Sequence, residues 1–271
     1  MRAAVVGHVE WMEFVPVESV PRRGEIVHAD ESWEQAAGGG SVAAVQLAKL
    51  ADSVDFFTAL GNDEHAERAR VELGARGVTV HATAVEAPQR SGFTFLDDSG
   101  ERTITTIGRK LHPRGHDDAL PWHELAGCDA VYFCAGDANA LVLARRARVL
   151  VATAREITTL RHASLELDGL VSSAKDEAER YQPGQLDPEP RLVVTTSGAL
   201  GGWAQPGGPY KAAPLPPDPA DAYGAGDCFA AGLAFALAAG LEGLDALDFA
   251  SRCGAGALAG PGVHAEVVPL P

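Results

Sequence analysis

The sequence predicts an α/β protein whose sheet is mostly parallel and covered by helices on both faces. Short apolar runs, such as RAAVVG at 2–7 and DAVYFCAG at 129–136, alternate with segments typical of helices. Strands of parallel sheets are buried on both sides, so they read as continuous apolar runs. The length of 271 residues allows one large α/β domain or two small ones, with a sizeable core in either case.

Local patterns place the elements in order along the chain. Apolar runs bounded by Gly, Pro or Asp predict strands, whereas runs of small or periodic apolar residues predict helices. For the main sheet we expect strands at 2–7, 54–61, 78–85, 129–136, 148–154, 168–174 and 191–205, and the last of these contains an internal turn. We expect helices at 38–51, 63–77, 228–240 and 245–259.

Two hairpins do not fit this alternation. Residues 8–17 and 25–33 read as two strands joined across a Pro-Arg-Arg-Gly turn. Residues 91–108 hold two alternating runs around an Asp-Asp-Ser-Gly turn. We expect both hairpins to form a small β appendage that stands off the edge of the main sheet.

Charge and cysteine content limit the possible partners. With a formal net charge of −15, the surface disfavours nucleic acid and anionic membranes as main partners. No apolar run approaches the length of about 18 residues that a membrane span needs. The first apolar run is too short for a secretory signal, and the four cysteines form no CxxC pair. We therefore expect a cytoplasmic protein with reduced cysteines.

A glycine-rich turn directly before an apolar helix is the strongest functional signal. In DAYGAGDCFAAGLAFAL at 221–237, Gly224, Ala225 and Gly226 precede Asp227, which lies in the first helical turn. Free amides and the helix dipole make such a turn an anion site. A carboxylate beside it suits removal of a proton from a hydroxyl that attacks phosphorus. The alternative is an ordinary glycine turn with Asp227 as a helix cap.

The segment DAYGAGD at 221–227 resembles the Asp-Thr-x-Gly-Ala-Gly-Asp signature of the ribokinase-like (PfkB) carbohydrate kinases, with Ala222 where Thr is usual. Other segments match the order of that family's motifs: AGGGS at 37–41, LGNDEHAERARVELGARGV at 60–78, DDSGERTI at 97–104 and TTSG at 195–198. The resemblance implies a single domain over residues 1–271 with a three-layer α-β-α ribokinase-like fold. It also implies that residues of about 8–36 and 90–108 form a lid.

The resemblance implies ATP-dependent phosphoryl transfer to a hydroxymethyl group of a sugar or sugar-like molecule. Asp227 would be the general base, with the amides of Gly224, Ala225 and Gly226 as the anion hole. The positions that would bind the nucleotide are Thr196, Gly198, Asp221, Gly224 and Gly226. In SSAKDE at 172–177, Ser173 and Asp176 stand nearest to the family's Asn-x-x-Glu, which organises Mg²⁺-bound water.

The acceptor side departs further from the family pattern. Gly38, Gly39 and Gly40 match glycines that let backbone approach the sugar. After the first strand, Glu10 and Met12 stand where sugar kinases carry Asn and Asp. Glu10 can accept hydroxyl hydrogen bonds.

Trp11 and Met12 together could offer a flat apolar surface, which favours a nucleoside kinase as the second hypothesis; Trp11 could equally pack within the lid. The altered motifs support a third hypothesis, a regulatory pseudo-kinase that binds a sugar or nucleotide.

Several charged and apolar side chains have two interpretations. His8 is more often structural than a ligand. Arg102 in the second hairpin serves either an anionic substrate or a solvated surface, and Arg155 matches the last position of the family's Asp-x-Asn-x-Arg segment. The exposed edges of two hairpins make a homodimer through the lid plausible.

Overall fold

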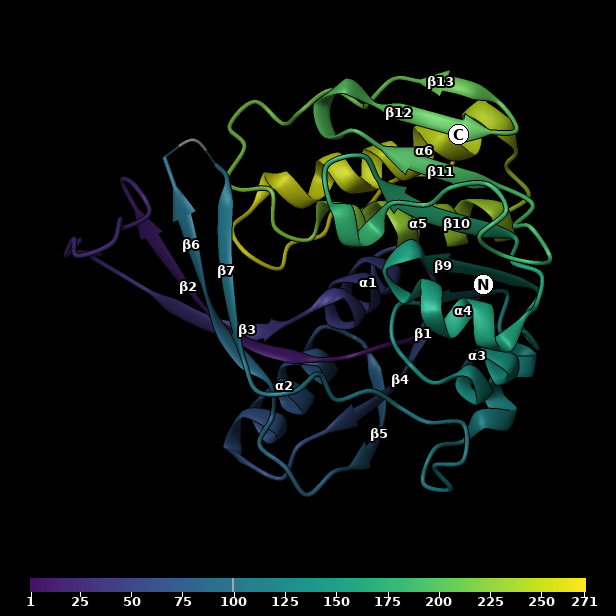
Figure 1. The fold of residues 1–271 in the computed structure, drawn as a ribbon, viewed down its shortest axis with the longest axis horizontal. Helices are drawn as coiled ribbons and strands as arrows, with labels where there is room; N and C mark the ends of the chain where they lie inside the picture. The colour runs from purple at the N-terminus through teal and green to yellow at the C-terminus, as the bar shows by residue number, and fades with distance from the viewer. Residues whose placement is uncertain (99) are drawn as a thin grey trace.

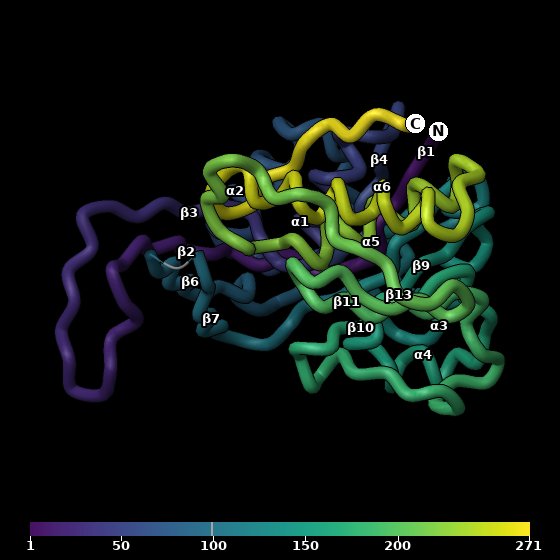
Figure 2. The backbone as a smooth tube through the Cα atoms, turned by 90° about the horizontal axis from the view of Figure 1, so that it is seen from above, coloured from purple at the N-terminus to yellow at the C-terminus, as the bar shows by residue number. Residues whose placement is uncertain are grey.

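The computed structural model describes residues 1–98 and 100–271; Ser99, in the turn predicted for the second hairpin, lies outside the described residues. Within that range the molecule has one large sheet between two layers of helices, and a smaller sheet beside it (Figure 1). This arrangement confirms the predicted fold class. The two chain ends lie close together, on the side far from the small sheet (Figure 2).

The large sheet has the order β13-β12-β11-β10-β9-β8-β1-β4-β5. From β11 to β5 every neighbouring pair is parallel, whereas β12 and β13 add antiparallel to one edge. The strands of this sheet are β1 (Arg2–Val6), β4 (Ser53–Leu60), β5 (Thr79–Ala84), β8 (Ala130–Phe133), β9 (Val149–Thr153), β10 (Gly169–Ser173), β11 (Val193–Thr196), β12 (Gly202–Gln205) and β13 (Gly208–Tyr210).

Helices cover both faces because the strands are apolar on both sides. In β1, Ala3 and Val5 join one core cluster with α1, α2, α5 and α6, while Ala4 and Val6 join a second with α3 and α4. The α-helices are α1 (Gly39–Ala48), α2 (Glu64–Ala75), α3 (Ala138–Ala144), α4 (Ile157–Ala163), α5 (Ala225–Ala238) and α6 (Gly243–Gly256). Short 3-10 helices lie at Trp122–Gly127, Ala154–Glu156, Glu177–Glu179, Gly198–Leu200 and Ala257–Ala259.

The small sheet is formed by β2 (Glu10–Val17), β3 (Trp33–Ala37), β6 (Ser91–Asp97) and β7 (Arg102–Ile107), in the order β3-β2-β6-β7. Each hairpin is antiparallel, and the two hairpins join through the parallel pair of β2 and β6. Because β2 follows closely on β1, the inner end of the small sheet lies at the carboxyl edge of the large sheet.

The prediction of a strand at 25–33 is wrong. The partner of β2 is β3, with Glu10 opposite Ala37 and Phe14 opposite Trp33. The apolar residues Ala36 and Ala37 are buried in the core, whereas Ile26 is 83% exposed. Pairing therefore follows the run that can be buried, and residues 18–32 form a loop that extends away from the body (Figure 2).

The inner face of the small sheet packs on the turn that precedes α5. Phe14 meets the ring of Tyr223 edge-on at a centroid distance of 4.9 Å. At the far end of the sheet, the amide of Ala222 donates to the carbonyl of Gly100 over 3.3 Å, and Arg102 Nη1 donates to the carbonyl of Ala222 over 3.1 Å. The small sheet thus contacts the turn through Phe14, in the middle of β2, and through the residues at its far end.

The outer face of the small sheet keeps apolar side chains exposed, among them Phe93 at 41% and Ile107 at 51%. The homodimer through this sheet stays a prediction. Across residues 1–98 and 100–271, no helix has the length and apolar character needed to cross a membrane.

Candidate active site

The glycine loop, residues 221–226, leaves backbone amides available at the start of α5. Gly224 adopts a φ of 75°, in the left-handed region, and a Cβ there would lie 2.7 Å from Val42 Cγ1, so a larger residue is excluded. Among the described residues, no protein acceptor pairs with the amides of Gly224 and Gly226. The amide of Ala225 makes only a long bond of 3.5 Å to the carbonyl of Ala222. The loop can therefore accept an anion.

Asp221 fixes the shape of this loop. Its carboxylate is buried and accepts the amides of Tyr223 over 2.7 Å and of Gly262 over 2.8 Å. Burial raises the pKa of Asp221, although the two amide bonds oppose that effect. Both oxygens are engaged by backbone, so Asp221 acts on the loop rather than on open space.

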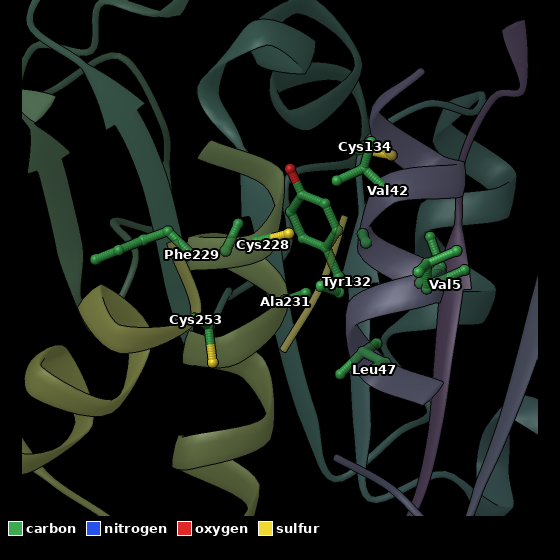
Figure 3. Close-up of a cluster of buried hydrophobic side chains, with 14 of the residues drawn as sticks. Val5, Val42, Leu47, Tyr132, Cys134, Cys228, Phe229, Ala231 and Cys253 are labelled. Atoms are coloured by element: carbon green, nitrogen blue, oxygen red, sulfur yellow. The ribbon is translucent and has the colours of Figure 1, made fainter. Parts of the chain in front are cut away.

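Asp227 lies in the first turn of α5, half-buried at the carboxyl edge of the sheet. Tyr132, near the end of β8, donates its hydroxyl to Asp227 Oδ1 over 3.3 Å. Figure 3 shows the Tyr132 ring within the buried cluster that also holds Val42 and Cys228. Burial raises the pKa of Asp227 to about 6; the charge of Glu179 adds to the rise, and the bond from Tyr132 opposes it. The carboxylate is thus a stronger base than an exposed aspartate, yet ionised at neutral pH.

The glycines at the start of α1 bring backbone against Asp227. A Cβ on Gly39 would lie 2.7 Å from Asp227 Oδ1. Gly38 adopts a φ of 84° and donates its amide to the hydroxyl of Tyr223 over 3.1 Å. A Cβ on Gly40 would lie 2.6 Å from the carbonyl oxygen of His8. These glycines are required by close packing of α1 against the end of β1 and against α5.

His8, Glu10, Gly38 and Gly39 form a polar floor beside Asp227. A Cβ on Gly38 would lie 3.0 Å from Glu10 Cγ, and Glu10 Oε1 pairs with Arg90 Nε at 3.1 Å. Burial raises the pKa of Glu10, against the charge of Arg90. Burial also lowers the pKa of His8 to about 3, and the charges of nearby cations add to this, so His8 is neutral. The floor therefore offers one paired carboxylate and a neutral imidazole.

A cavity of about 930 Å³ lies on the other side of the glycine loop. Its lining includes Thr196, Gly198 and Gly226. Lys175 also lines it, with Nζ 3.3 Å from where a Cβ on Gly198 would be. Its apolar wall includes Tyr210, Leu215, Phe229 and Leu258. The loop thus separates a large, partly apolar cavity from the polar floor.

The order of these features matches a known family. A family model described as pfkB family carbohydrate kinase matches residues 2–155 and 135–269. The chain belongs to the PfkB family of carbohydrate kinases. The kinase is 26% identical over 276 residues to an ATP-dependent ribose-1-phosphate kinase of Halopiger xanaduensis, a match that covers 94% of this chain and 91% of that protein.

Solved structures show the same fold for the kinase. It superposes on a ribokinase from Thermotoga maritima with a TM-score of 0.76 and 19% identity, covering 96% of this chain and 94% of the other. An adenosine kinase from Sinorhizobium meliloti gives a TM-score of 0.74 and 16% identity, covering 99% and 96% of the two chains. The structural likeness shows the fold at these identities.

Trp11 and Met12 lie where a flat acceptor surface was expected, but both are buried. Met12 is fully buried, and a Cβ on Gly92 would lie 2.9 Å from its Cε. Trp11 points to the opposite face of β2, where it stacks on His65 and lies 4.4 Å below the guanidinium of Arg68. Alternation along β2 places these two side chains on different faces, so they do not form one surface.

Ser173 and Asp176 lie at the end of β10, where the Mg²⁺-organising site was expected. Ser173 Oγ accepts the amide of Asp176 over 3.3 Å, and Asp176 caps the following 3-10 helix. Arg155 binds Asp176 and, over 2.7 Å, Glu179. Glu179 is the carboxylate of this group whose charge acts most on Asp227. The structure thus adds Glu179 to the two residues named from sequence, and brings to them Arg155, which the sequence had matched to a different family segment.

Tyr132, Tyr223 and Arg90 are site residues that the sequence pattern does not reveal. The hydroxyl of Tyr132 near the end of an apolar strand was the one available signal, because a buried hydroxyl usually has a partner. Tyr223 lies inside the signature itself, and its hydroxyl accepts the Gly38 amide. Arg90 is recognised only through its pairing with Glu10 across 80 residues of sequence.

Proposed function

We propose that this kinase transfers the terminal phosphoryl group of ATP to a hydroxymethyl group of a sugar or sugar-like molecule. The observation that carries the proposal is the position of Asp227. Its carboxylate lies against Gly39 of the polar floor. It follows directly on the amides of Gly224 and Gly226, which have no protein acceptor among the described residues. A base between an alcohol site and an anion site is what phosphoryl transfer requires.

The acceptor oxygen forms a bond to the γ-phosphorus as Asp227 takes the hydroxyl proton. The bond between this phosphorus and the bridging oxygen breaks, and ADP leaves with the electron pair. The amides of Gly224 and Gly226 stabilise the charge on the transferred group. The pKa of Asp227, raised by burial to about 6, favours proton capture while the group remains ionised at pH 7.

Tyr132 positions the base in this proposal. Its hydroxyl donates a hydrogen bond to Asp227 Oδ1 over 3.3 Å. Asp227 Oδ2 is then the oxygen that would take the proton of the acceptor hydroxyl. The Tyr132 side chain is itself fixed by burial in the core. Its pKa lies well above the usual range through burial and the charge of Asp227, so it stays protonated and donates.

ATP is proposed to occupy the large cavity. The relative from Halopiger xanaduensis is named as ATP-dependent, and the cavity of about 930 Å³ combines an apolar wall with Lys175 and the glycine loop. Thr196 and Gly198 would lie beside the phosphates.

Mg²⁺ is proposed to be held mainly by phosphate oxygens and water. Among the described residues, no group of three or more His, Cys, Asp or Glu side chains could hold a metal ion. Asp176 and Glu179 are each tied to Arg155, so they would reach the ion through water, which fits the reluctance of Mg²⁺ to lose its hydration. When bound, the ion supplies charge neutralisation on the phosphates.

Observations of the structure disfavour the two other hypotheses, a nucleoside kinase and a pseudo-kinase. The nucleoside kinase hypothesis was favoured by the altered sugar-binding positions and by a flat surface of Trp11 and Met12. That surface does not form, because the two side chains are buried on opposite faces of β2. The pseudo-kinase hypothesis is disfavoured because the groups that phosphoryl transfer needs are in place. The amides of Gly224 and Gly226 have no protein acceptor among the described residues, and the neighbouring Asp227 has a raised pKa.

An assay of ADP formation over a panel of pentoses, hexoses, their phosphates and nucleosides tests the proposal. We expect ATP-dependent turnover with at least one sugar-like acceptor that carries a free hydroxymethyl group. Turnover with nucleosides alone would favour the second hypothesis. Silence across the panel, with thermal stabilisation by the same ligands, would favour a pseudo-kinase.

A further inference from the structure

The segment of residues 262–264 contacts the chain on both sides of the glycine loop. The amide of Gly262 donates to Asp221 Oδ2 over 2.8 Å, where the loop begins. The carbonyl of His264 accepts a hydrogen bond from Cys228 Sγ over 3.7 Å, directly after Asp227 in the chain. The 262–264 segment is therefore placed to fix both the loop and the start of the helix that carries the proposed base.

Gln35 in β3 joins the small sheet to this segment. Its side chain is only 7% exposed, and its Oε1 accepts the amide of Val263 over 3.0 Å and Nε1 of Trp33 over 3.1 Å. Because both partners are N–H donors, the oxygen of the Gln35 amide must be the atom that faces them. Gly262 adopts a φ of 64°, and a Cβ there would lie 2.1 Å from Gln35 Oε1, so a larger residue is excluded from this contact.

A second connection runs from the end of β3 to the same loop. Gly38, just after β3, donates its amide to the hydroxyl of Tyr223 over 3.1 Å, and the amide of Tyr223 donates to Asp221 Oδ1 over 2.7 Å. With Gln35 and the 262–264 segment, these bonds close a ring of buried polar contacts that starts at β3 and returns to the residue after it. A loop that buried hydrogen bonds hold from two directions keeps one shape.

From this ring we infer that Gln35 is a positioning residue for phosphoryl transfer. It holds the glycine loop, through the 262–264 segment and Asp221, in the shape that aims the loop amides at the transferred group. The inference rests on the proposed function, because it takes this loop as the anion site. Donors that are aimed at developing charge stabilise the transition state more than the bound substrates. Loss of the Gln35 contact should therefore lower kcat more than it changes KM.

Two substitutions of Gln35 test this role by steady-state kinetics with ATP and the best acceptor. Gln35→Met keeps the length of the side chain and removes the acceptor oxygen, so two N–H donors lose their partner. We expect kcat to fall by about 10-fold, with KM for ATP and for the acceptor changed by less than about 2-fold. Gln35→Glu keeps an oxygen that accepts in either protonation state, so kcat should return to within about 3-fold of wild type.

Gln46→Met is the matched control. Gln46 is a fully buried glutamine of α1, and its Nε2 donates to the carbonyl of Glu266 over 3.2 Å, beyond the 262–264 segment. The same substitution there removes a buried amide without touching the ring of contacts. We expect the melting temperature to fall in both methionine variants, whereas kcat of Gln46→Met should stay within about 2-fold of wild type.

Amide hydrogen exchange of the free protein tests the link between Gln35 and the loop without turnover. In Gln35→Met, peptides that cover residues 221–229 and 260–264 should exchange faster than in wild type, whereas peptides of β1, β4 and β8 should not change.

Unchanged kcat in Gln35→Met, a loss of kcat shared by Gln46→Met, or faster exchange spread over all peptides would overturn the inference and leave the proposed function intact. No turnover by wild type with any acceptor, together with faster exchange confined to the two segments in Gln35→Met, would contradict the proposed function and leave the link between Gln35 and the loop standing.

Discussion

The proposed phosphate side of the site is built from the backbone of one loop, whereas the proposed acceptor side is built from side chains of several distant segments. The glycine loop shapes its anion site with small residues and one buried carboxylate, Asp221. The acceptor side joins Glu10 to Arg90. A backbone site can hold the same group in many relatives. A site made of paired side chains can change its ligand without changing the fold.

Asp227 joins the two sides, and Asp227→Asn should have the largest effect. We expect turnover to fall by at least about 100-fold, because the proposed general base is lost. Asp245→Asn is the matched control, since Asp245 lies exposed in the first turn of the neighbouring helix α6. Near-normal turnover of the Asp227 variant in a coupled ADP assay would refute the assignment of the base.

The same variant should be at least as stable as wild type. The pKa of Asp227 is raised in the folded state from 3.8 to about 6. Between these values the folded state holds more protons than the unfolded state, so this group's contribution to stability falls as pH rises through that window. The melting temperature of Asp227→Asn relative to wild type should therefore rise between pH 4 and 6 and level off above. A relative decline with pH would show that the carboxylate is not raised in pKa.

Gly39→Ala tests the close contact between the polar floor and the base. The new methyl would lie 2.7 Å from Asp227 Oδ1, so the carboxylate must move. We expect turnover to fall by about 10-fold or more, since small displacements of reacting groups are costly. Gly74→Ala in α2 is the control. Apart from its own turn of helix, no described residue has an atom within 4 Å of the added methyl, so activity should stay unchanged. Full activity of Gly39→Ala would place the acceptor elsewhere.

Tyr132→Phe should have a smaller and pH-dependent effect. The change removes the hydroxyl that holds Asp227 Oδ1 and keeps the buried ring. The pKa of Asp227 should rise because that bond opposes the shift. We expect kcat/KM at pH 7 to fall by about 3- to 10-fold and to recover in part at higher pH. A loss that is the same at every pH would indicate a purely structural role.

Arg102→Ala should have the smallest effect. The change removes the bond from the small sheet to the carbonyl of Ala222, on the exposed side of the site. Exposed contacts contribute little, so we expect KM for ATP to rise by about 2- to 5-fold with kcat nearly unchanged. Arg23→Ala, in the exposed loop beyond β2, is the control and should change neither constant. A large fall in kcat would mean that the small sheet takes part in the transfer itself.

Much of the fold was predictable because strands that are buried on both faces of a sheet are continuous apolar runs in the sequence. The glycine loop was predictable for a similar reason, since its shape depends on residues adjacent in sequence. The strand expected at 25–33 is wrong because β2 pairs with the run that ends in the buried pair Ala36 and Ala37, and two small alanines give only a weak strand signal in the sequence. Tyr132 and Arg90 could not be assigned from sequence, because their roles arise from contacts across 95 and 80 residues and no local pattern records them.

The pH dependence of kcat/KM, measured on wild type with saturating ATP and the best acceptor, tests the role of Asp227 most directly. The account predicts that kcat/KM is constant above neutral pH. Below the raised pKa of Asp227, about 6, kcat/KM should fall tenfold for each pH unit. Circular dichroism at each pH would establish that the protein stays folded. A profile that remains level from pH 7 down to about 4.5 would contradict it, because an unperturbed or uninvolved carboxylate would then explain the data.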